Sequence, residues 1–348
     1  MIVNNYKPFN NAVNRQITFL NFNQDFTCLL LGLVDGFKIF SINPFSKRSE
    51  SLETSLEIGA MLFSTSLFVY TSNEKEITKE FNTENEEFQF QNQNQNQNQD
   101  HYKLLIKNLL SNQLIHQLKF PTKILGTKQN QKRLVVALES QIHIYDLTNL
   151  ERLGICKIKS GSGVLALSSG NNCYLAYPPS SDSGRVTLFD ALNMRMIHSI
   201  KCHNSRITKI EFSRDEKLFA TVSKKGTIIR IFQVRNPKNT LCELRRGSKA
   251  RKIYHIAFSS NSEFLSVTSE SGTIHIFKIK EKGSFLSVAN RSFIEIKYRK
   301  STPHLAYYDL DRGGVVVATS EGKLFFCEID PNNIKKQYKF TNQESLMI

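Results

Sequence analysis

Two adjacent arginines, Arg245 and Arg246, form the pattern in this chain that is best suited to binding anions. They belong to the strand-like segment Leu244-Arg245-Arg246-Gly247. Successive side chains of a β-strand point to opposite faces, so the two guanidinium groups cannot line a single pocket. The pair therefore predicts two separate anion sites, one on each side of the strand.

Positive charge is concentrated around this pair. Residues 195–252 contain 16 lysines and arginines against four acidic residues, an excess of 12, whereas the whole chain has a net charge of +15. Such a basic balance indicates a polyanionic partner, either a nucleic acid or an anionic lipid surface.

Other kinds of chemistry find little support. The longest apolar stretches, such as 28–31 and 67–70, are far shorter than the roughly 20 residues of a membrane span. The first residues lack the organisation of a signal peptide, so a cytoplasmic protein is expected. The six cysteines are scattered without metal-ligand spacing, which predicts buried free thiols and no metal. No nucleophile elbow, zinc-protease or phosphate-loop motif occurs, so neither catalysis nor a cofactor is expected.

A repeat in the sequence indicates the strands that position the two arginines. Segments rich in β-branched and aromatic residues alternate with turn residues, at 36–40, 141–146, 184–190, 226–232, 272–277 and 322–326. Between Ile142 and Ile274 they recur roughly every 40 residues, the period of a four-stranded propeller blade. Tyr145-Asp146 and Phe189-Asp190 take the place of the Trp-Asp pair of such repeats. We expect an all-β, seven-bladed β-propeller of the WD40 type.

This single domain is expected to cover residues 10–331, with a degenerate second blade that carries an insertion. Residues 72–100 are polar and end in a Gln-Asn run, which predicts a disordered loop rather than a self-associating segment. Residues 332–348 are also polar and predict a frayed tail.

The chain resembles the PROPPIN family, the WIPI-type propellers that bind phosphoinositides in autophagy and endolysosomal traffic. The family's L/F-R-R-G signature is present here as Leu244-Arg245-Arg246-Gly247. Further matches lie at 21–25, 36–40, 61–67, 133–136, 174–178 and 220–230.

The resemblance implies a non-catalytic effector that binds phosphatidylinositol 3-phosphate and phosphatidylinositol 3,5-bisphosphate through two rim pockets in blades 5 and 6. The first pocket would be formed by Arg245, Arg230, Thr227, Ser223 and His203. The second would be formed by Arg246, Lys249, Ser269, Thr273 and His275. The protein would recruit autophagy proteins, and we expect a monomer in solution that attaches peripherally to phagophore, endosomal or vacuolar membranes.

Several of these residues have a structural alternative. His203 and Ser223 occupy positions where WD-type repeats place residues that are hydrogen-bonded within the blade. His275 could be an exposed strand residue, and Lys249 departs from the residue that many relatives carry. Thr227 does not share a strand face with Arg230, so it can contribute only from the hairpin end after Gly226.

Relatives also carry a loop in blade 6 that dips into the bilayer. The corresponding segment here, residues 280–290, is short but contains Phe285, Leu286 and Val288. These side chains either insert into the membrane or pack against the following strand, at 292–296, and the sequence favours neither alternative.

A scaffold that binds RNA is the alternative function for the same basic region. Such binding needs exposed aromatic residues for base stacking. The nearby aromatics Phe212, Phe219, Phe232 and Tyr254 follow the spacing of strand cores, which favours the lipid-binding interpretation. The preferred phosphoinositide, the recruited protein, and an autophagosomal or endolysosomal role remain open from sequence.

Overall fold

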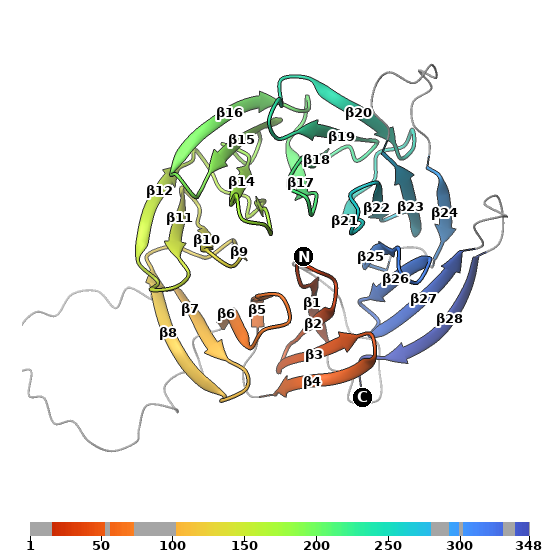
Figure 1. The fold of residues 1–348 in the computed structure, drawn as a ribbon, viewed down its shortest axis with the longest axis horizontal. Coiled ribbons are helices and arrows are strands. Elements are labelled where there is room, and N and C mark those ends of the chain that lie inside the picture. The colour runs from red at the N-terminus through yellow and green to blue at the C-terminus, as the bar shows by residue number, and fades with distance from the viewer. Residues whose placement is uncertain are drawn as a thin grey trace, which may run out of the picture.

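The computed structural model describes residues 16–52, 56–72, 102–279, 292–298, 302–329 and 338–347. These residues form 28 strands in seven four-stranded antiparallel sheets, arranged as a ring of blades (Figure 1). The predicted seven-bladed propeller is therefore confirmed. The described residues contain no helix capable of spanning a bilayer.

Each blade consists of four consecutive strands. Blade 1 comprises β1 (Ile17–Phe22), β2 (Cys28–Leu33), β3 (Gly36–Ile42) and β4 (Phe45–Ser51), and blade 2 comprises β5 (Leu56–Met61), β6 (Leu67–Ser72), β7 (Tyr102–Asn108) and β8 (Gln113–Phe120). Blade 3 comprises β9 (Gly126–Gln129), β10 (Arg133–Ala137), β11 (Gln141–Asp146) and β12 (Arg152–Lys157). Blade 4 comprises β13 (Ala166–Leu167), β14 (Tyr174–Tyr177), β15 (Arg185–Asp190) and β16 (Arg195–Lys201). Blade 5 comprises β17 (Ile207–Phe212), β18 (Leu218–Ser223), β19 (Ile228–Gln233) and β20 (Thr240–Arg245). Blade 6 comprises β21 (Ile253–Phe258), β22 (Phe264–Ser269), β23 (Thr273–Lys278) and β24 (Ile294–Lys297). Blade 7 comprises β25 (His304–Asp309), β26 (Gly314–Thr319), β27 (Lys323–Ile329) and β28 (Tyr338–Ser345).

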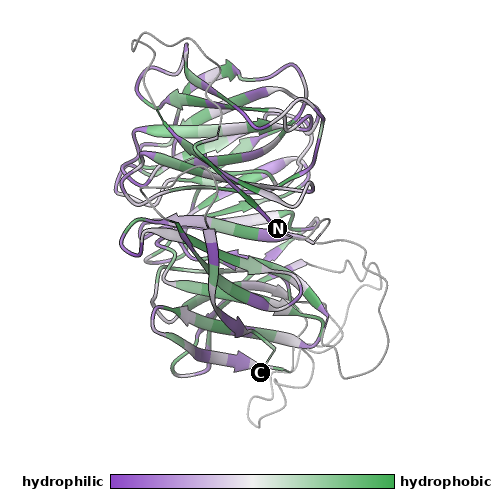
Figure 2. Cartoon of the chain, turned by 90° about the vertical axis from the view of Figure 1, so that its right-hand side faces the viewer, coloured by the Kyte–Doolittle hydropathy of each residue, from purple (hydrophilic) through white to green (hydrophobic). Residues whose placement is uncertain are grey.

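The position of a strand within its blade determines its residue pattern. Every residue of β2, β22 and β26 is buried, because a second strand is covered on both faces by the neighbouring blades. Outer strands are more exposed: β12 has a single buried residue, Cys156, and β20 alternates between buried and exposed residues from Cys242 to Arg245. Apolar stretches accordingly run along the stacked strands in Figure 2. The segments that revealed the repeat in the sequence are the third strands β3, β11, β15, β19, β23 and β27.

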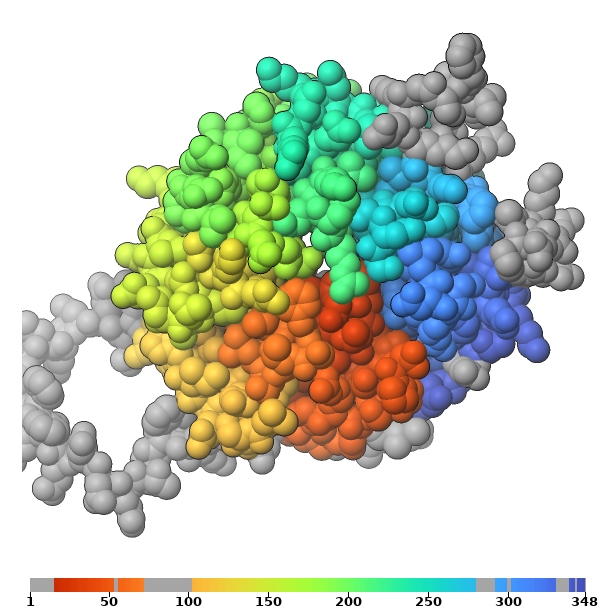
Figure 3. All heavy atoms as spheres, in the orientation of Figure 1, coloured from red at the N-terminus to blue at the C-terminus, as the bar shows by residue number. Residues whose placement is uncertain are grey.

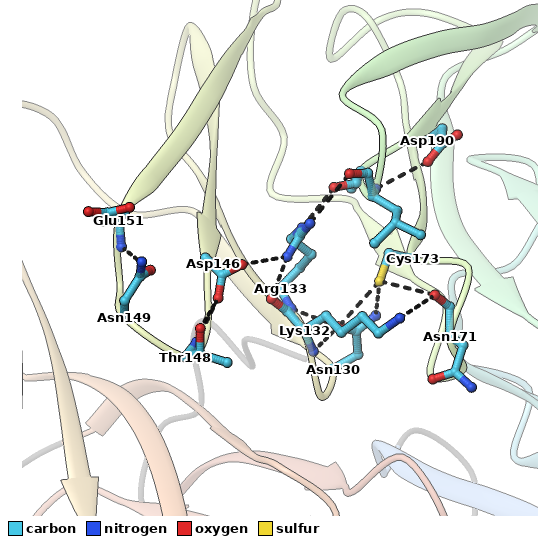
Figure 4. A network of polar contacts seen from close by, with 12 residues as sticks. Asn130, Lys132, Arg133, Asp146, Thr148, Asn149, Glu151, Asn171, Cys173 and Asp190 are labelled. Carbon is cyan, nitrogen blue, oxygen red and sulfur yellow. Dashed lines mark hydrogen bonds and ion pairs between the residues drawn. The ribbon is translucent and has the colours of Figure 1, made fainter.

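Polar contacts reinforce the junction between blades 3 and 4 (Figure 4). Arg133 of β10 is buried, and its Nε donates to the Ala191 carbonyl of blade 4 at 2.8 Å. Its Nη1 lies 2.9 Å from the Asp146 carboxylate. Asp146 also accepts from the Thr148 amide at 2.9 Å, and Asp190 accepts from the amides that follow it. The acids of both Trp-Asp-like pairs thus fix the turn after a third strand.

The ring closes between blades 7 and 1 by side-chain packing, since each blade supplies its own four strands. Phe26 stacks on Tyr307 with ring centroids 4.5 Å apart. The Tyr307 hydroxyl donates to the Phe26 carbonyl at 3.3 Å, and Lys38 donates to the Met347 carbonyl at 3.3 Å. The C-terminus lies beside blade 1 (Figure 1).

The expectation of a frayed tail at 332–348 was wrong for its second half, which forms β28 and pairs with β27. An outermost strand is largely exposed and needs few apolar residues, so its composition resembles that of a tail. Phe340 of β28 packs edge-on against Phe325, and Leu346, directly after the strand, is fully buried.

The predicted disordered insertion falls between β6 and β7 of blade 2. Residues 73–101, which include most of it, lie outside the described residues.

Candidate functional site

The arginine pair lies at the end of the outer strand of blade 5. Arg245 is the last residue of β20 and pairs with Ile228 of β19. Leu244 before it is fully buried among the side chains that join blade 5 to blade 6, including Ile256. Because side chains alternate along a strand, Arg245 lies on the opposite flank, toward blade 4. Arg246 follows on the blade 6 side, so the predicted separation of the two guanidinium groups agrees with the structure.

Arg246 is held in place by backbone carbonyls. Its side chain is buried, with a residue exposure of 9%. Nε donates to the Gly226 carbonyl at 2.8 Å, and Nη2 donates to the carbonyl of Lys249. Its own amide donates to the Thr227 carbonyl at 2.9 Å. Neutral carbonyls orient the group without cancelling its charge, which leaves a preorganised cation at the rim.

The surroundings of Arg246 are electropositive. Burial, followed by the charge of Arg251, lowers the pKa of Arg246, although an arginine remains protonated at neutral pH. No carboxylate among the described residues forms an ion pair with it. An anion that binds here therefore meets a positive charge that the fold has not compensated.

Arg245 contrasts with its neighbour. Its side chain is exposed, and it has no hydrogen bond or ion pair in the part of the chain that the structure describes. On the same flank, Arg230 Nε lies 2.7 Å from the Glu243 carboxylate, and Arg230 Nη1 donates to the Cys202 carbonyl at 2.7 Å. This flank thus combines one free arginine with one that is anchored.

His203 makes hydrogen bonds within its blade, as the structural alternative in the sequence analysis predicts. Its Nε2 lies 3.0 Å from the Thr221 hydroxyl, and its Nδ1 lies 3.4 Å from Arg230 Nη1. An arginine can only donate, so Nδ1 accepts and Nε2 carries the proton. Burial, and then the charge of Arg230, lower the pKa of His203 to about 4, so the ring is neutral at pH 7. Its geometry suits positioning Arg230.

The remaining residues of the first group lie at the adjoining turn. Ser223 ends β18 and is buried, and Thr227 is half-buried between Gly226 and the start of β19. Thr227 therefore lies at the hairpin end, where the sequence analysis placed it. What these two hydroxyls bind stays a prediction.

The second group lies on the blade 6 side of the pair. Ser269 is fully buried at the end of β22, with its hydroxyl 2.8 Å from that of Ser271, and Thr273 begins β23. Lys249 is exposed, and only its carbonyl is engaged by Arg246. Ser269 and Thr273 thus flank the turn between β22 and β23, while Lys249 lies beside Arg246.

His275 is buried, contrary to the alternative of an exposed strand residue. Its Nδ1 lies 3.3 Å from the Ser292 hydroxyl and 3.6 Å from the Glu295 carboxylate. Burial lowers the pKa of His275 to about 4, Glu295 opposes this shift and Arg246 adds to it. The influence of Arg246 shows that the two residues belong to one electrostatic environment.

Blades 5 and 6 repeat one arrangement that the sequence analysis missed. Opposite Arg230 on β19 stands Glu243, and opposite His275 on β23 stands Glu295. Two residues after each glutamate comes an exposed cation, Arg245 in one blade and Lys297 in the other. The repeated Glu-apolar-cation pattern could have identified Lys297 as the counterpart of Arg245. The space-filling view shows blades 5 and 6 adjoining on the ring (Figure 3).

Phe285, Leu286 and Val288, the candidates for membrane insertion, lie outside the described residues, between β23 and β24. The four aromatics considered for RNA stacking are described and buried, at exposures of 0–6%: Phe212, Phe219, Phe232 and Tyr254. They belong to the core and are not available as a stacking surface.

Comparison with known proteins identifies the family. A PROPPIN family model matches residues 16–287. Autophagy-related protein 18 of Dictyostelium discoideum is 35% identical over 303 residues, which cover 87% of this chain and 74% of that protein. Autophagy-related protein 18 of Aspergillus oryzae is 35% identical over 289 residues, covering 76% of this chain and 63% of that protein.

Solved structures agree with this assignment. KlAtg21, in its complex with the coiled coil of AgAtg16, is 27% identical with a TM-score of 0.75, covering 95% of this chain and 99% of that chain. Kluyveromyces lactis Hsv2 shares the fold with a TM-score of 0.76 at 18% identity, covering 95% and 99% respectively. The chain is a member of the PROPPIN family of non-enzymatic β-propellers.

Proposed function

We propose that this protein is a peripheral membrane effector that binds phosphatidylinositol 3-phosphate and phosphatidylinositol 3,5-bisphosphate at two rim positions in blades 5 and 6. The observation that carries the proposal is the arrangement of Arg245 and Arg246. They lie on opposite flanks of one outer strand, and neither is neutralised by a carboxylate among the described residues. Each flank therefore offers a guanidinium group whose planar donors match phosphate oxygens.

The first position is assigned to Arg245 and Arg230, with support from Thr227, Ser223 and His203. Arg245 supplies the free charge, while the contacts with Glu243 and His203 hold Arg230 in a fixed orientation. The second position is assigned to Arg246, Lys249, Ser269, Thr273 and His275. There the fixed guanidinium supplies the charge, and the exposed Lys249 side chain is free to turn toward a phosphate.

Two positions on one rigid blade junction favour a membrane over a soluble headgroup. Once one lipid is bound, the second engagement is effectively intramolecular, which can raise the overall affinity by about 10²–10⁴-fold. Individually weak sites then suffice for stable attachment, and a cytoplasmic pool exchanges with phagophore, endosomal or vacuolar membranes.

Recruitment of autophagy or endolysosomal proteins forms the second half of the proposal. The related KlAtg21 was solved with the coiled coil of AgAtg16. In this chain the outer hairpin of blade 2 exposes three large apolar side chains, Leu110, Leu114 and Ile115, at 89%, 41% and 53% exposure. Because a coiled coil presents apolar side chains along one stripe, we assign this hairpin to a helical partner of that kind.

Liposome flotation tests the lipid assignment. Arg245→Thr with Arg246→Thr should abolish binding to vesicles that contain phosphatidylinositol 3-phosphate. The matched control is Lys47→Thr with Arg48→Thr, which removes an adjacent exposed cation pair from the outer strand of blade 1. Equal loss in both double variants would show that only net charge matters, and unchanged binding of the first variant would overturn the proposal.

In cells, a tagged protein should form puncta during starvation that disappear when phosphatidylinositol 3-kinase is inhibited. Puncta that persist without the lipid would contradict a lipid-dependent localisation.

A further inference from the structure

The axis of the propeller contains a cavity that neither rim position uses. Its volume is about 310 Å³, and all seven blades line it through their innermost strands or the residues just before them. This size is at the lower end of the roughly 300–1,000 Å³ of small-molecule sites. The cavity is thus large enough for a small ligand.

Two lysines and one glutamate supply the charge in this cavity. Lys128 comes from β9 of blade 3, and Lys209 and Glu211 come from β17 of blade 5. Neither lysine side chain forms a hydrogen bond or an ion pair in the part of the chain that the structure describes. The other lining carboxylate, Glu57, is already paired with Lys123 at 3.1 Å.

The lysines influence each other and their surroundings. Burial, followed by the charges of Lys128 and Lys252, lowers the pKa of Lys209 to about 8, while Glu211 opposes the shift. Because Glu57 is paired with Lys123, Glu211 is left as one carboxylate facing two ammonium groups. His255 of β21 adds no charge, because burial and Lys209 lower its pKa to about 3.

We propose that the central channel is a binding site for a small soluble anion of the phosphate class, held by Lys128 and Lys209. The two ammonium groups belong to blades that are not neighbours, since blade 4 lies between them. A ligand that reaches both needs several acceptor oxygens, which favours pyrophosphate or a similar phosphate compound over chloride. Arg214 lines the adjoining part of the channel and is exposed, so it adds positive charge at the entrance.

This site is independent of the proposed lipid-binding function, and the test keeps the two apart. The background variant is Arg245→Thr with Arg246→Thr, which removes the rim positions. Calorimetric titration with inorganic pyrophosphate at constant ionic strength should still detect one site in this variant. Adding Lys128→Met and Lys209→Met should weaken that binding at least about tenfold, as expected for loss of charge-assisted hydrogen bonds.

Glu211→Gln provides a test of opposite sign, because it removes the like charge that an anion meets in the cavity. It should strengthen pyrophosphate binding. Lys119→Met, at an exposed position on β8, is the control and should change nothing. Lys128→Met with Lys209→Met should leave liposome binding intact when the rim arginines are present.

Three results would refute the proposed anion site. They are no pyrophosphate binding in the background variant, full binding after both lysines are replaced, and a calorimetric response to chloride equal to that for pyrophosphate. If the double lysine variant does not fold, the Glu211→Gln result decides, and unchanged or weaker binding in that variant refutes the proposal.

Discussion

Replacing Arg246 by alanine should destabilise the propeller, whereas the same replacement of Arg245 should leave its stability nearly unchanged. Arg246 is buried and donates to the carbonyls of Gly226 and Lys249. Arg245 is exposed and has no partner among the described residues. The two substitutions remove the same side chain from adjacent positions, so each is the other's control.

The size of the difference follows from these contacts. A hydrogen bond to a charged group contributes about 1.5–3 kcal/mol, and Arg246 makes two from its side chain. Its position at the edge of the blade lets water reach the vacated carbonyls, so we expect a loss of about 2 kcal/mol in the free energy of unfolding. Replacing an exposed side chain without partners typically changes it by less than about 0.5 kcal/mol.

Urea denaturation followed by tyrosine fluorescence measures both values. Arg246→Lys should fall between wild type and Arg246→Ala, because an ammonium group keeps the charge but cannot reproduce the planar fork. Both alanine variants should lose liposome binding. Equal stability of the two alanine variants would refute the inference that the fold anchors one arginine and leaves the other free.

Three further predictions concern the framework around the site. Stability should fall as the pH is lowered from about 6.5 to about 4, because the unfolded chain takes up protons at His203 and His275 that the folded chain does not. Replacing both by glutamine should reduce this dependence in urea titrations, and an unchanged slope would contradict it. Leu346→Ala should cost about 2–4 kcal/mol in denaturation experiments, because this side chain is fully buried at the junction of blades 7 and 1. A neutral result would mean that the segment after β28 does not help to close the ring. Arg133→Met should cost about 2–3 kcal/mol, because it leaves Asp146 without its buried partner, and thermal unfolding at the level of the wild type would count against the clamp between blades 3 and 4.

The features of the fold that could be predicted from sequence depend on local pattern. Third strands begin near a glycine and end in an aromatic or apolar pair, so they were recognised in six blades. The strand β28 was missed because an outermost strand exposes most of its residues, and its composition then resembles that of a tail. The residues just after β28 pack on blade 1, which is more than 280 residues away in the sequence, as the contact between Lys38 and Met347 illustrates.

In the site, too, features set by local geometry could be predicted and features set by distant contacts could not. Alternation along a strand was enough to separate Arg245 from Arg246, because it requires only local geometry. The partners of Arg246 could not be predicted, since the carbonyl of Gly226 is oriented by a turn with a left-handed glycine at φ 60°. The burial of His203 and His275 could not be predicted either, because it depends on how residues distant in the sequence pack, and burial makes these rings neutral.

Arg246 is held in a fixed orientation and Arg245 is not, and this difference affects what each costs to order on a ligand. Ordering a flexible arginine on a ligand costs up to about 2 kcal/mol of side-chain entropy. For Arg246 this cost is met during folding, because two carbonyls already fix the guanidinium group. In the proposed lipid-binding function, Arg245 stays mobile, and once Arg246 had bound one lipid, the membrane would keep a second headgroup within reach of Arg245. Under that proposal, a fixed cation beside a mobile one would combine a defined first contact with tolerance in the spacing of the second lipid.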